Sequence, residues 1–187
     1  MSDLKVNSIT GSTSTGVHIP GHVMQVQYLQ YTGTFSQAFS ANTSTAVGSS
    51  TLIVNITPSS ASSIIKLDAH IMHEWSNVNA PHETAWFFYR DTTKLAHPAA
   101  GSRSVGITPS LTSYHQDATS TPEAVSYTYF DSPNTTSQIT YKVGVVGYYA
   151  NTVHVNRTVN DTDNGQAERG ISFISATEIA QWQKQEN

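Results

Sequence analysis

The sequence has no cysteine and few charged residues, and both absences narrow the classes of protein to consider. Without cysteine no disulfide can form, so stability beyond that of one packed core has to come from association of subunits. Charged residues make up only 12% of the 187 residues, and the formal net charge is −4. A basic surface that binds nucleic acid is therefore not expected.

Long apolar segments are also absent. No run approaches the roughly 18 apolar residues of a membrane-spanning helix, and the opening residues Met-Ser-Asp-Leu-Lys-Val lack the apolar stretch of a secretory signal. Asn-X-Thr triplets begin at Asn134, Asn156 and Asn160, but a chain this rich in threonine contains them by chance. Neither membrane insertion nor glycosylation is predicted.

No reactive group stands in a recognisable catalytic setting. The chain has no Gly-X-Ser-X-Gly motif and no glycine loop for phosphate. Its carboxylates are few and scattered, so a facing pair for glycoside hydrolysis is not indicated. Serine is so abundant that a chance Ser-His-Asp trio carries no weight. We therefore predict a protein that is not an enzyme and needs no cofactor.

Two groups of residues raise the question of a metal ion. His70 and His73 are three apart, a spacing that sends two side chains to opposite faces of a strand. A hydrogen-bonded core histidine is expected at His73. The acidic stretch of Asp161, Asp163 and Asn164 lacks the glycine and distal glutamate of a 12-residue calcium loop, which favours a solvated turn. No metal site is predicted, although histidines gathered around a threefold axis remain an alternative.

The residues that are abundant suit β-sheets. Serine and threonine, 24 each, fill 48 of the 187 positions, and Thr, Val, Ile and Tyr fit pleated surfaces. Short alternating segments recur about every 8–15 residues between polar turns, and no convincing helix is present. We predict an all-β fold, a two-layer antiparallel β-sandwich with jelly-roll-like order and about eight to ten strands.

Alternation predicts which side chains form the core. From Ile65 to Trp75, apolar residues at every second position mark the clearest long strand. In the first strand, Met24, Val26 and Tyr28 alternate with two glutamines, which predicts that these three side chains are buried.

The segment Thr84–Arg90 is apolar on both faces. Trp86 and Phe88 share one face, and Phe87 lies on the other. A two-layer sandwich covers only its inner face, so a strand of this kind needs cover on a second side. We predict a subunit interface at Trp86 and Phe88, and the alternative is cover by a loop or by the N-terminal segment.

The first 22 residues differ from the rest of the chain. They contain few large apolar groups, interior glycines and a Pro-Gly turn, so alone they could not offset their ordering entropy. We predict an extended attachment arm over residues 1–22, a sandwich domain over 23–180 and a polar tail over 181–187. The arm would lie on a partner, or else on its own domain. Its contacts are expected from its aliphatic side chains: Leu4, Val6, Ile9, Val17 and Ile19.

Several segments, taken in order, resemble a known family. They are Val6-Asn-Ser-Ile-Thr-Gly-Ser-Thr, His22-Val-Met-Gln-Val-Gln, the stretch 52–67, Trp86-Phe-Phe-Tyr-Arg-Asp, Phe130-Asp-Ser-Pro, Ile139-Thr-Tyr-Lys-Val, Val153-His-Val-Asn-Arg and Ile171-Ser-Phe-Ile-Ser-Ala-Thr-Glu-Ile-Ala. This order resembles small β-sandwich modules in virion proteins of tailed bacteriophages, many from cyanobacterial and marine hosts. The resemblance covers most of residues 22–180. It implies a jelly-roll-like sandwich, usually trimeric, in fibres, spikes or capsid decorations, with no shared catalytic residues.

The predicted function follows from this resemblance. We expect a structural protein on the virion surface, a homotrimer that decorates or cements the capsid, anchored by its arm to the major capsid protein or another virion protein. The alternative is a short tail fibre or receptor-binding adhesin that recognises a host surface glycan. The candidate aromatic side chains for stacking on such a glycan are Tyr114, Tyr148 and Tyr149, and the alternative, favoured for each, is a core or interface tyrosine.

Overall fold

The computed structural model describes residues 21–48, 50–76, 83–110 and 121–181. These ranges contain twelve β-strands and no α-helix, which confirms the all-β prediction. The count exceeds the expected eight to ten because the two-residue strands β3 and β8 have no signature in the sequence. The strands are β1 (Val23–Tyr31), β2 (Phe35–Phe39), β3 (Thr45–Ala46), β4 (Ile53–Ile56), β5 (Ile64–Trp75), β6 (Thr84–Arg90), β7 (Thr93–Leu95), β8 (Thr108–Pro109), β9 (Glu123–Asp131), β10 (Ile139–Gly147), β11 (Asn151–Val155) and β12 (Ser172–Ile179).

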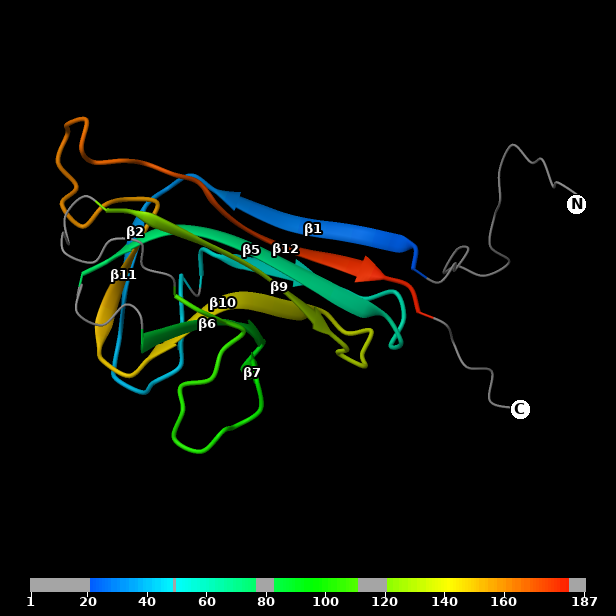
Figure 1. The fold of residues 1–187 in the computed structure, drawn as a ribbon. Coiled ribbons are helices and arrows are strands. Elements are labelled where there is room, and N and C mark those ends of the chain that lie inside the picture. The colour runs from blue at the N-terminus through cyan, green and yellow to red at the C-terminus, as the bar shows by residue number, and fades with distance from the viewer. Residues whose placement is uncertain (1–20, 49, 77–82, 111–120, 182–187) are drawn as a thin grey trace, which may run out of the picture.

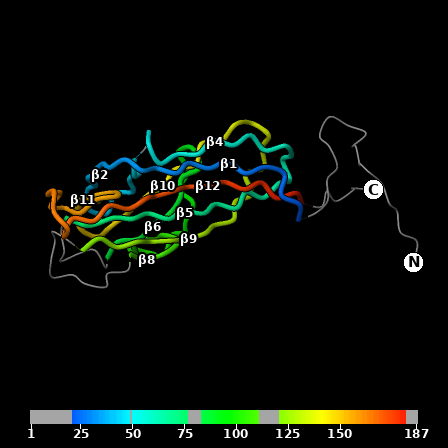
Figure 2. Tube along the Cα trace, turned by 90° about the horizontal axis from the view of Figure 1, so that it is seen from above, coloured from blue at the N-terminus to red at the C-terminus, as the bar shows by residue number. Residues whose placement is uncertain are grey.

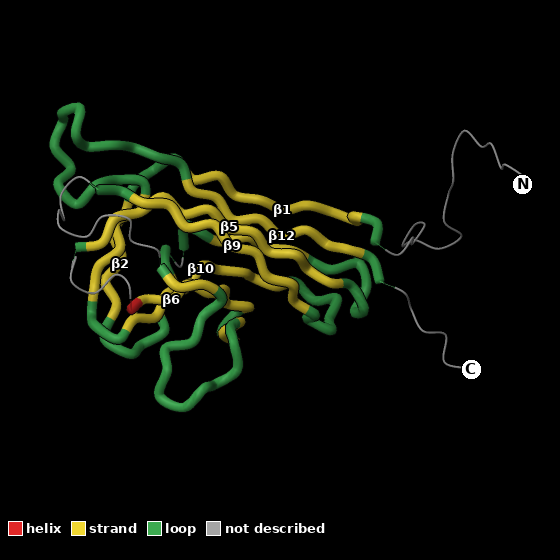
Figure 3. Tube along the Cα trace, viewed as in Figure 1, coloured by secondary structure: helices red, strands yellow, loops and turns green. Residues whose placement is uncertain are grey.

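The strands form two antiparallel sheets that pack face to face (Figures 1 and 3). Sheet A has the order β1-β12-β5-β11-β2, and β9 pairs with the other side of β5. Sheet B has the order β3-β10-β6-β7, and β4 and β8 pair with β10 and β6. When β2, β3, β8 and β11 are set aside, the other eight strands are divided into β1-β12-β5-β9 and β4-β10-β6-β7, which is the order of a jelly roll. The predicted β-sandwich is confirmed.

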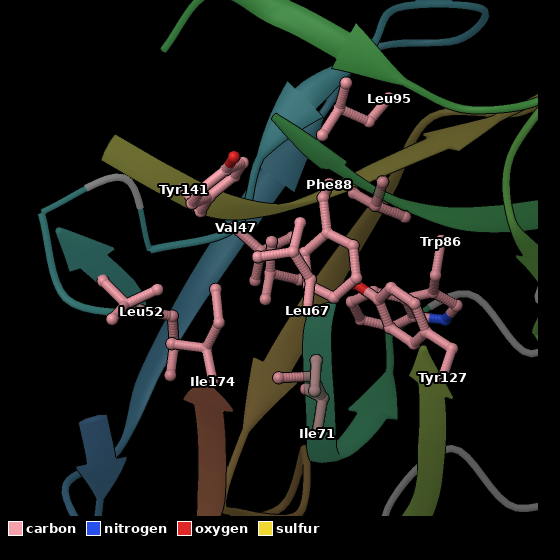
Figure 4. Packing of buried hydrophobic residues seen from close by; sticks show 14 of the residues in the cluster. Val47, Leu52, Leu67, Ile71, Trp86, Phe88, Leu95, Tyr127, Tyr141 and Ile174 are labelled. Atoms are coloured by element: carbon pink, nitrogen blue, oxygen red, sulfur yellow. The ribbon is translucent and has the colours of Figure 1, made fainter. Parts of the chain in front are cut away.

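The core lies between the sheets and follows the predicted alternation. On β5, every second side chain from Ile65 to Trp75 is buried, and those from Lys66 to Met72 on the opposite face are half-buried. Leu67 and Ile71 face inward among aromatic side chains from other strands (Figure 4). Each fully buried side chain of this size contributes about 1.5–3 kcal/mol to stability.

Strand β6 is apolar on both faces, and the same chain covers both. Trp86 and Phe88 are completely buried in the main core (Figure 4). On the other face, Phe87 is also completely buried, beneath Lys94 Nζ at 4.3 Å from its ring centroid and the loop through Ile107. The expected subunit contact at Trp86 and Phe88 is wrong, because the opposite sheet encloses both rings and leaves no surface for a neighbour.

The side chains of β1 lie on the opposite faces from those predicted. Val26 and Tyr28 are exposed, while Leu29 and Tyr31 pack against the core. A register shift between Val23 and Gln25 marks a bulge, which changes the face on which the following side chains lie. The expected burial of Val26 and Tyr28 is therefore wrong, although the strand itself is present.

A buried carboxylate joins the two sheets. Asp131, at the end of β9 in sheet A, accepts hydrogen bonds from Arg90 Nη1 of β6 at 3.0 and 3.1 Å. It also accepts one from the Tyr141 hydroxyl of β10 at 2.7 Å. Burial, reinforced by the Asp131 carboxylate, raises the pKa of Tyr141, so this hydroxyl remains a donor. Removing one partner would leave a charge buried without compensation.

Both ends of the described chain leave from one end of sheet A. Gly21 N donates to Ala180 O at 2.8 Å, and Ala180 N donates to His22 O at 2.9 Å, so β1 begins where β12 finishes (Figures 1 and 2). We call this the terminal end. The turn between β10 and β11, with Tyr148 and Tyr149, lies at the opposite, distal end.

Candidate functional site

The residues predicted to anchor the protein lie outside the described ranges, as does one of the three tyrosines predicted to contact a glycan. They remain predictions. The set comprises Leu4, Val6, Ile9, Val17, Ile19 and Tyr114.

Exposed large apolar side chains gather on the outer face of sheet A. Six of the eight such side chains in the described residues lie there. Tyr28 is 74% exposed and Phe130 58%. We call this set the outer apolar face: Val23, Val26, Tyr28, Phe130, Ile171 and Phe173.

Strand register brings these residues together, because residues opposite each other in antiparallel strands point to the same face. Two rows cross the sheet from β1 through β12 and β5 to β9. One row is Val26, Thr177, Lys66 and Phe130, and the next is Tyr28, Ser175, Asp68 and Thr128. Apolar side chains therefore flank a polar centre.

The polar side chains in the middle of this face are bonded to one another. Lys66 Nζ lies 2.8 Å from Asp68 Oδ2, and the Thr128 hydroxyl donates to Asp68 Oδ1 at 2.5 Å. His70 Nδ1 lies 2.7 Å from Ser126 Oγ. Because these groups already have partners, another protein surface could cover them without leaving them unsatisfied.

A shallow hollow of about 510 Å³ lies on the same face. Asp68, Ser126, Thr128, Phe173 and Ser175 line it. Ser175, which lines the hollow, lies opposite Tyr28 on β1, so this exposed tyrosine is next to the recess.

Glu178 fixes the position of β1 at the terminal end. The carboxylate is buried and accepts four hydrogen bonds, each of 2.7 Å: from Ser59 N, Ser59 Oγ and Ser63 Oγ, and from Gln25 Nε2. Burial raises the pKa of Glu178, but the hydrogen bonds from Ser59, Gln25 and Ser63 outweigh it, and the pKa is lower than usual. Because Gln25 is held inward by this charge, the alternating side chains Val26 and Tyr28 point outward.

The two remaining exposed aromatic side chains lie at the distal end. Tyr148 and Tyr149 contact each other edge to face, with ring centroids 4.7 Å apart. Tyr148 also lines a hollow of about 410 Å³, together with Glu83, Arg103 and neighbouring serines. The sequence favoured a core or interface position for these two tyrosines over a stacking surface for a glycan, and the structure places both on the surface.

His70 and His73 point to opposite faces of β5, as their spacing predicts. His73 is buried, its Nδ1 donates to Ile71 O at 3.1 Å, and its ring packs edge to face against Trp75 and Trp86. Burial lowers the pKa of His73 to about 4, so the ring is neutral near pH 7. The prediction of a core histidine is confirmed.

The acidic loop between β11 and β12 forms local contacts. Asp161 pairs with Arg157 at 3.6 Å and with Arg169. Asn164 Oδ1 accepts from Gln166 N at 2.9 Å, which makes the predicted turn. Within residues 21–48, 50–76, 83–110 and 121–181, no three His, Asp or Glu side chains are grouped to hold a metal ion.

Sequence reasoning missed the outer apolar face. Alternation in β1 indicated a strand but did not show which set of side chains turned inward. A usable signal lay in β12 and the residue before it, because Ile171 and Phe173 are out of phase with the buried Ile174 and Ala176. Two apolar sets on one strand indicate cover on both sides, as they did for β6.

Comparison of the chain with protein-family models and with curated protein sequences gives no match. No helix long and apolar enough to cross a bilayer occurs in the part of the chain that the structure describes. Two surfaces of the molecule are candidates for function: the outer apolar face and the hollow beside Tyr148 at the distal end.

Proposed function

We propose that this protein is a non-enzymatic structural protein of a bacteriophage virion, a homotrimer that decorates or cements the capsid through its N-terminal arm. The observation that carries the proposal is the outer apolar face. Large exposed apolar side chains on one sheet face, with polar groups among them, are typical of sites of protein association. The resemblance to virion modules, described from the sequence, supplies the setting.

A second copy of the chain is the partner that the outer apolar face fits. Aromatic side chains such as Tyr28 and Phe130 are enriched at protein interfaces. The charges on the face are neutralised within it, by the pair of Lys66 and Asp68. A like surface can therefore cover it without burying an unpaired charge.

Apolar side chains at both edges of sheet A favour a closed ring of subunits. Val26 and Tyr28 lie on β1 at one edge, and Phe130 lies on β9 at the other, with polar residues between them. Contact between the β1 edge of one copy and the β9 edge of the next would be heterologous, and such contacts close into a ring when the rotation allows it. A trimer is the ring that the resemblance implies.

The terminal end suits attachment. The described chain begins at Gly21 beside Ala180, so in a threefold ring three arms would start from one side of the assembly. Because the three arms are linked, binding of one arm raises the effective concentration of the others at the particle surface. Several weak contacts then give tight attachment. The distal end would then face away from the particle.

The oligomer is tested with two double variants. Tyr28→Ser with Phe130→Ser should convert a trimer to a monomer in light scattering, with an unchanged far-UV circular dichroism spectrum. Tyr148→Ser with Tyr149→Ser removes the other exposed rings and should leave the mass unchanged. A wild-type protein that is monomeric at tens of micromolar, a trimer that survives the first pair, or a trimer lost in the second would refute the proposed interface.

Attachment is tested by deleting residues 2–20. The shortened protein should remain a folded trimer and lose co-sedimentation with particles of its phage. The copy number per virion separates decoration, with hundreds of copies, from a tail appendage. A shortened protein that decorates particles normally would rule out the role of the arm.

A receptor-binding adhesin is the second candidate function. The hollow beside Tyr148 is the observation that favours it, because this hollow lies at the distal end and combines an exposed ring with charged and hydroxyl side chains.

A further inference from the structure

Two adjoining hollows form a groove at the distal side of sheet B. One measures about 410 Å³ and reaches Tyr148 and Glu83, and the other measures about 310 Å³ and reaches His97. Both are lined by Arg103 and Ser104, so these residues lie where the hollows meet. We call the pair the distal groove. Its volume is in the range of small-molecule sites, although it is open to solvent.

The loop of residues 96–107, which forms one wall of the distal groove, is held against β6. Ile107 N donates to Trp86 O at 2.7 Å, and His97 N donates to Gly106 O at 3.3 Å. A Cβ on Gly106 would lie 2.7 Å from the Cβ of Ala85, so only glycine allows this close approach. Contacts between this loop and β6 therefore hold this wall of the distal groove in place.

Arg103 is presented from the tip of this loop. Gly101 has φ 65°, a left-handed conformation that glycine adopts without strain, and Arg103 N donates to Ala100 O at 3.4 Å across the turn. The guanidinium is exposed, and Nη1 donates to Ala100 O at 3.1 Å. The backbone thus fixes where this cation stands.

Arg103 differs from the other three arginines of the chain. Arg90, Arg157 and Arg169 each pair with an aspartate. Arg103 has no carboxylate within ion-pair distance among the described residues. In a chain of net charge −4, this leaves a cation that is complementary to an anionic ligand.

Tyr148 supplies a flat surface at the other end of the groove. Its ring is 56% exposed, and the edge contact with Tyr149 supports it. The negative face of an aromatic ring attracts polarised C–H groups, which line one face of a pyranose sugar. Ser102 and Ser104, on either side of Arg103 in the chain, line the same hollow and offer further hydrogen-bonding groups.

We propose that the distal groove binds a saccharide that carries a carboxylate, with Arg103 paired to the carboxylate and the Tyr148 ring stacked on a sugar. Glu83 accepts hydrogen bonds from sugar hydroxyls and, by repulsion, leaves Arg103 as the place for the acid group. This inference names the ligand class for the adhesin function and rests on it, but it does not depend on the trimer.

The same chemistry argues against an acidic peptide as the occupant. A peptide needs backbone partners, and the polar side chains that the groove offers are hydroxyls, one histidine, one carboxylate and one cation, beside a tyrosine ring and apolar residues such as Ala85 and Pro109. A carboxylated sugar uses the hydroxyls, the carboxylate, the cation and the ring at once. Because the groove is shallow, we expect a Kd of about 1 mM or somewhat below for a short oligosaccharide.

The test uses the full chain and trigalacturonate, titrated by calorimetry or ligand-observed NMR, with maltotriose as the neutral comparison. Trigalacturonate should bind at least about tenfold more tightly than maltotriose. Arg103→Ala and Tyr148→Ala should each weaken binding by about tenfold. Arg169→Ala removes the same charge outside the groove and should change binding by less than about twofold.

Three results would overturn the inference: equal binding of trigalacturonate and maltotriose, unchanged binding by Arg103→Ala, or a triglutamate peptide that binds as tightly as trigalacturonate. Measuring the mass of the same samples by light scattering tests the proposed trimer independently of ligand binding. A monomeric protein that still binds trigalacturonate would refute the proposed subunit interface and support the binding groove.

Discussion

The outer faces of the two sheets both carry apolar side chains, but among the described residues only the face of sheet B is covered. On sheet B, Phe87 and Val146 are buried beneath Lys94 and the loop through Ile107. On sheet A, residues such as Tyr28 and Phe173 are open to solvent. Within the described part of the chain, a loop covers the outer face of sheet B, and no segment covers the outer face of sheet A.

The difference separates the stability of the subunit from its capacity to associate. Burial of apolar surface contributes about 25 cal/mol per Å² wherever it occurs. The covered face makes that contribution within one chain, so it should be needed for folding. The bare face can make it only when another molecule arrives, so changes there should alter assembly and leave the fold intact.

The largest expected contrast is between Trp86→Asp and Tyr28→Asp. The first buries a charge in the core between the sheets and should cost more than about 4 kcal/mol, enough to unfold the chain. The second lies on the bare face and should change the free energy of unfolding of the monomer by less than about 0.5 kcal/mol. Chemical denaturation followed by circular dichroism measures both. A Trp86→Asp protein that is folded and monomeric would instead show that Trp86 lies in the subunit contact.

The pH dependence of stability should distinguish the two faces of β5. The pKa of His73 is about 4 in the folded chain, against 6.5 for the free side chain, so the unfolded state binds more protons between these values. Stability should therefore fall as the pH drops from 6.5 to 4, by about 3 kcal/mol in total. Urea denaturation at pH 7, 5.5 and 4.5 gives the slope.

Two variants isolate this effect. His73→Leu should flatten the slope, and His70→Leu, on the outer face, should keep it. His154 also has a lowered pKa, through burial and then the charge of Arg157, so some slope should persist in every variant. Equal slopes for wild type and His73→Leu would show that His73 is not the group responsible.

A smaller effect should reveal how tightly the cover on sheet B is packed. A Cβ at Gly144 would overlap the ring of Phe87, which the loop prevents from moving away. Gly144→Ala should therefore lower the free energy of unfolding by about 1–3 kcal/mol. Gly165→Ala, which has open space around it, serves as the control and should have almost no effect. A neutral Gly144→Ala would mean that the cover over Phe87 yields easily.

Periodicity predicted the fold because burial repeats along each strand. Every second residue of β5 is buried as expected, and the same alternation buries Val143 and Val145 of β10. The two-faced pattern of β6 also predicted cover on both sides. It did not show whether the cover was a loop or a subunit, because a loop rich in Ser, Gly and Pro has no apolar periodicity of its own.

The candidate sites were harder to find. A one-residue bulge near Met24 reversed the faces of β1, and no residue in that segment announces it. Gln25 turned inward because a buried carboxylate, Glu178, lies across from it at 2.7 Å in a strand 153 positions away. The distal groove likewise depends on Arg103 and Tyr148, which stand 45 positions apart and meet only through the packing of a loop on β6.

The amino-acid sequence alone determined that the chain forms strands and that alternating aliphatic and hydroxyl side chains make a two-layer sandwich, because side-chain alternation is a local property of extended backbone. Only the tertiary structure decided which outer face is covered and that Arg103 and Tyr148 line the same hollow. Those outcomes depend on which distant segments of the chain pack against a sheet, and the sequence of a strand that is apolar on both faces does not show this.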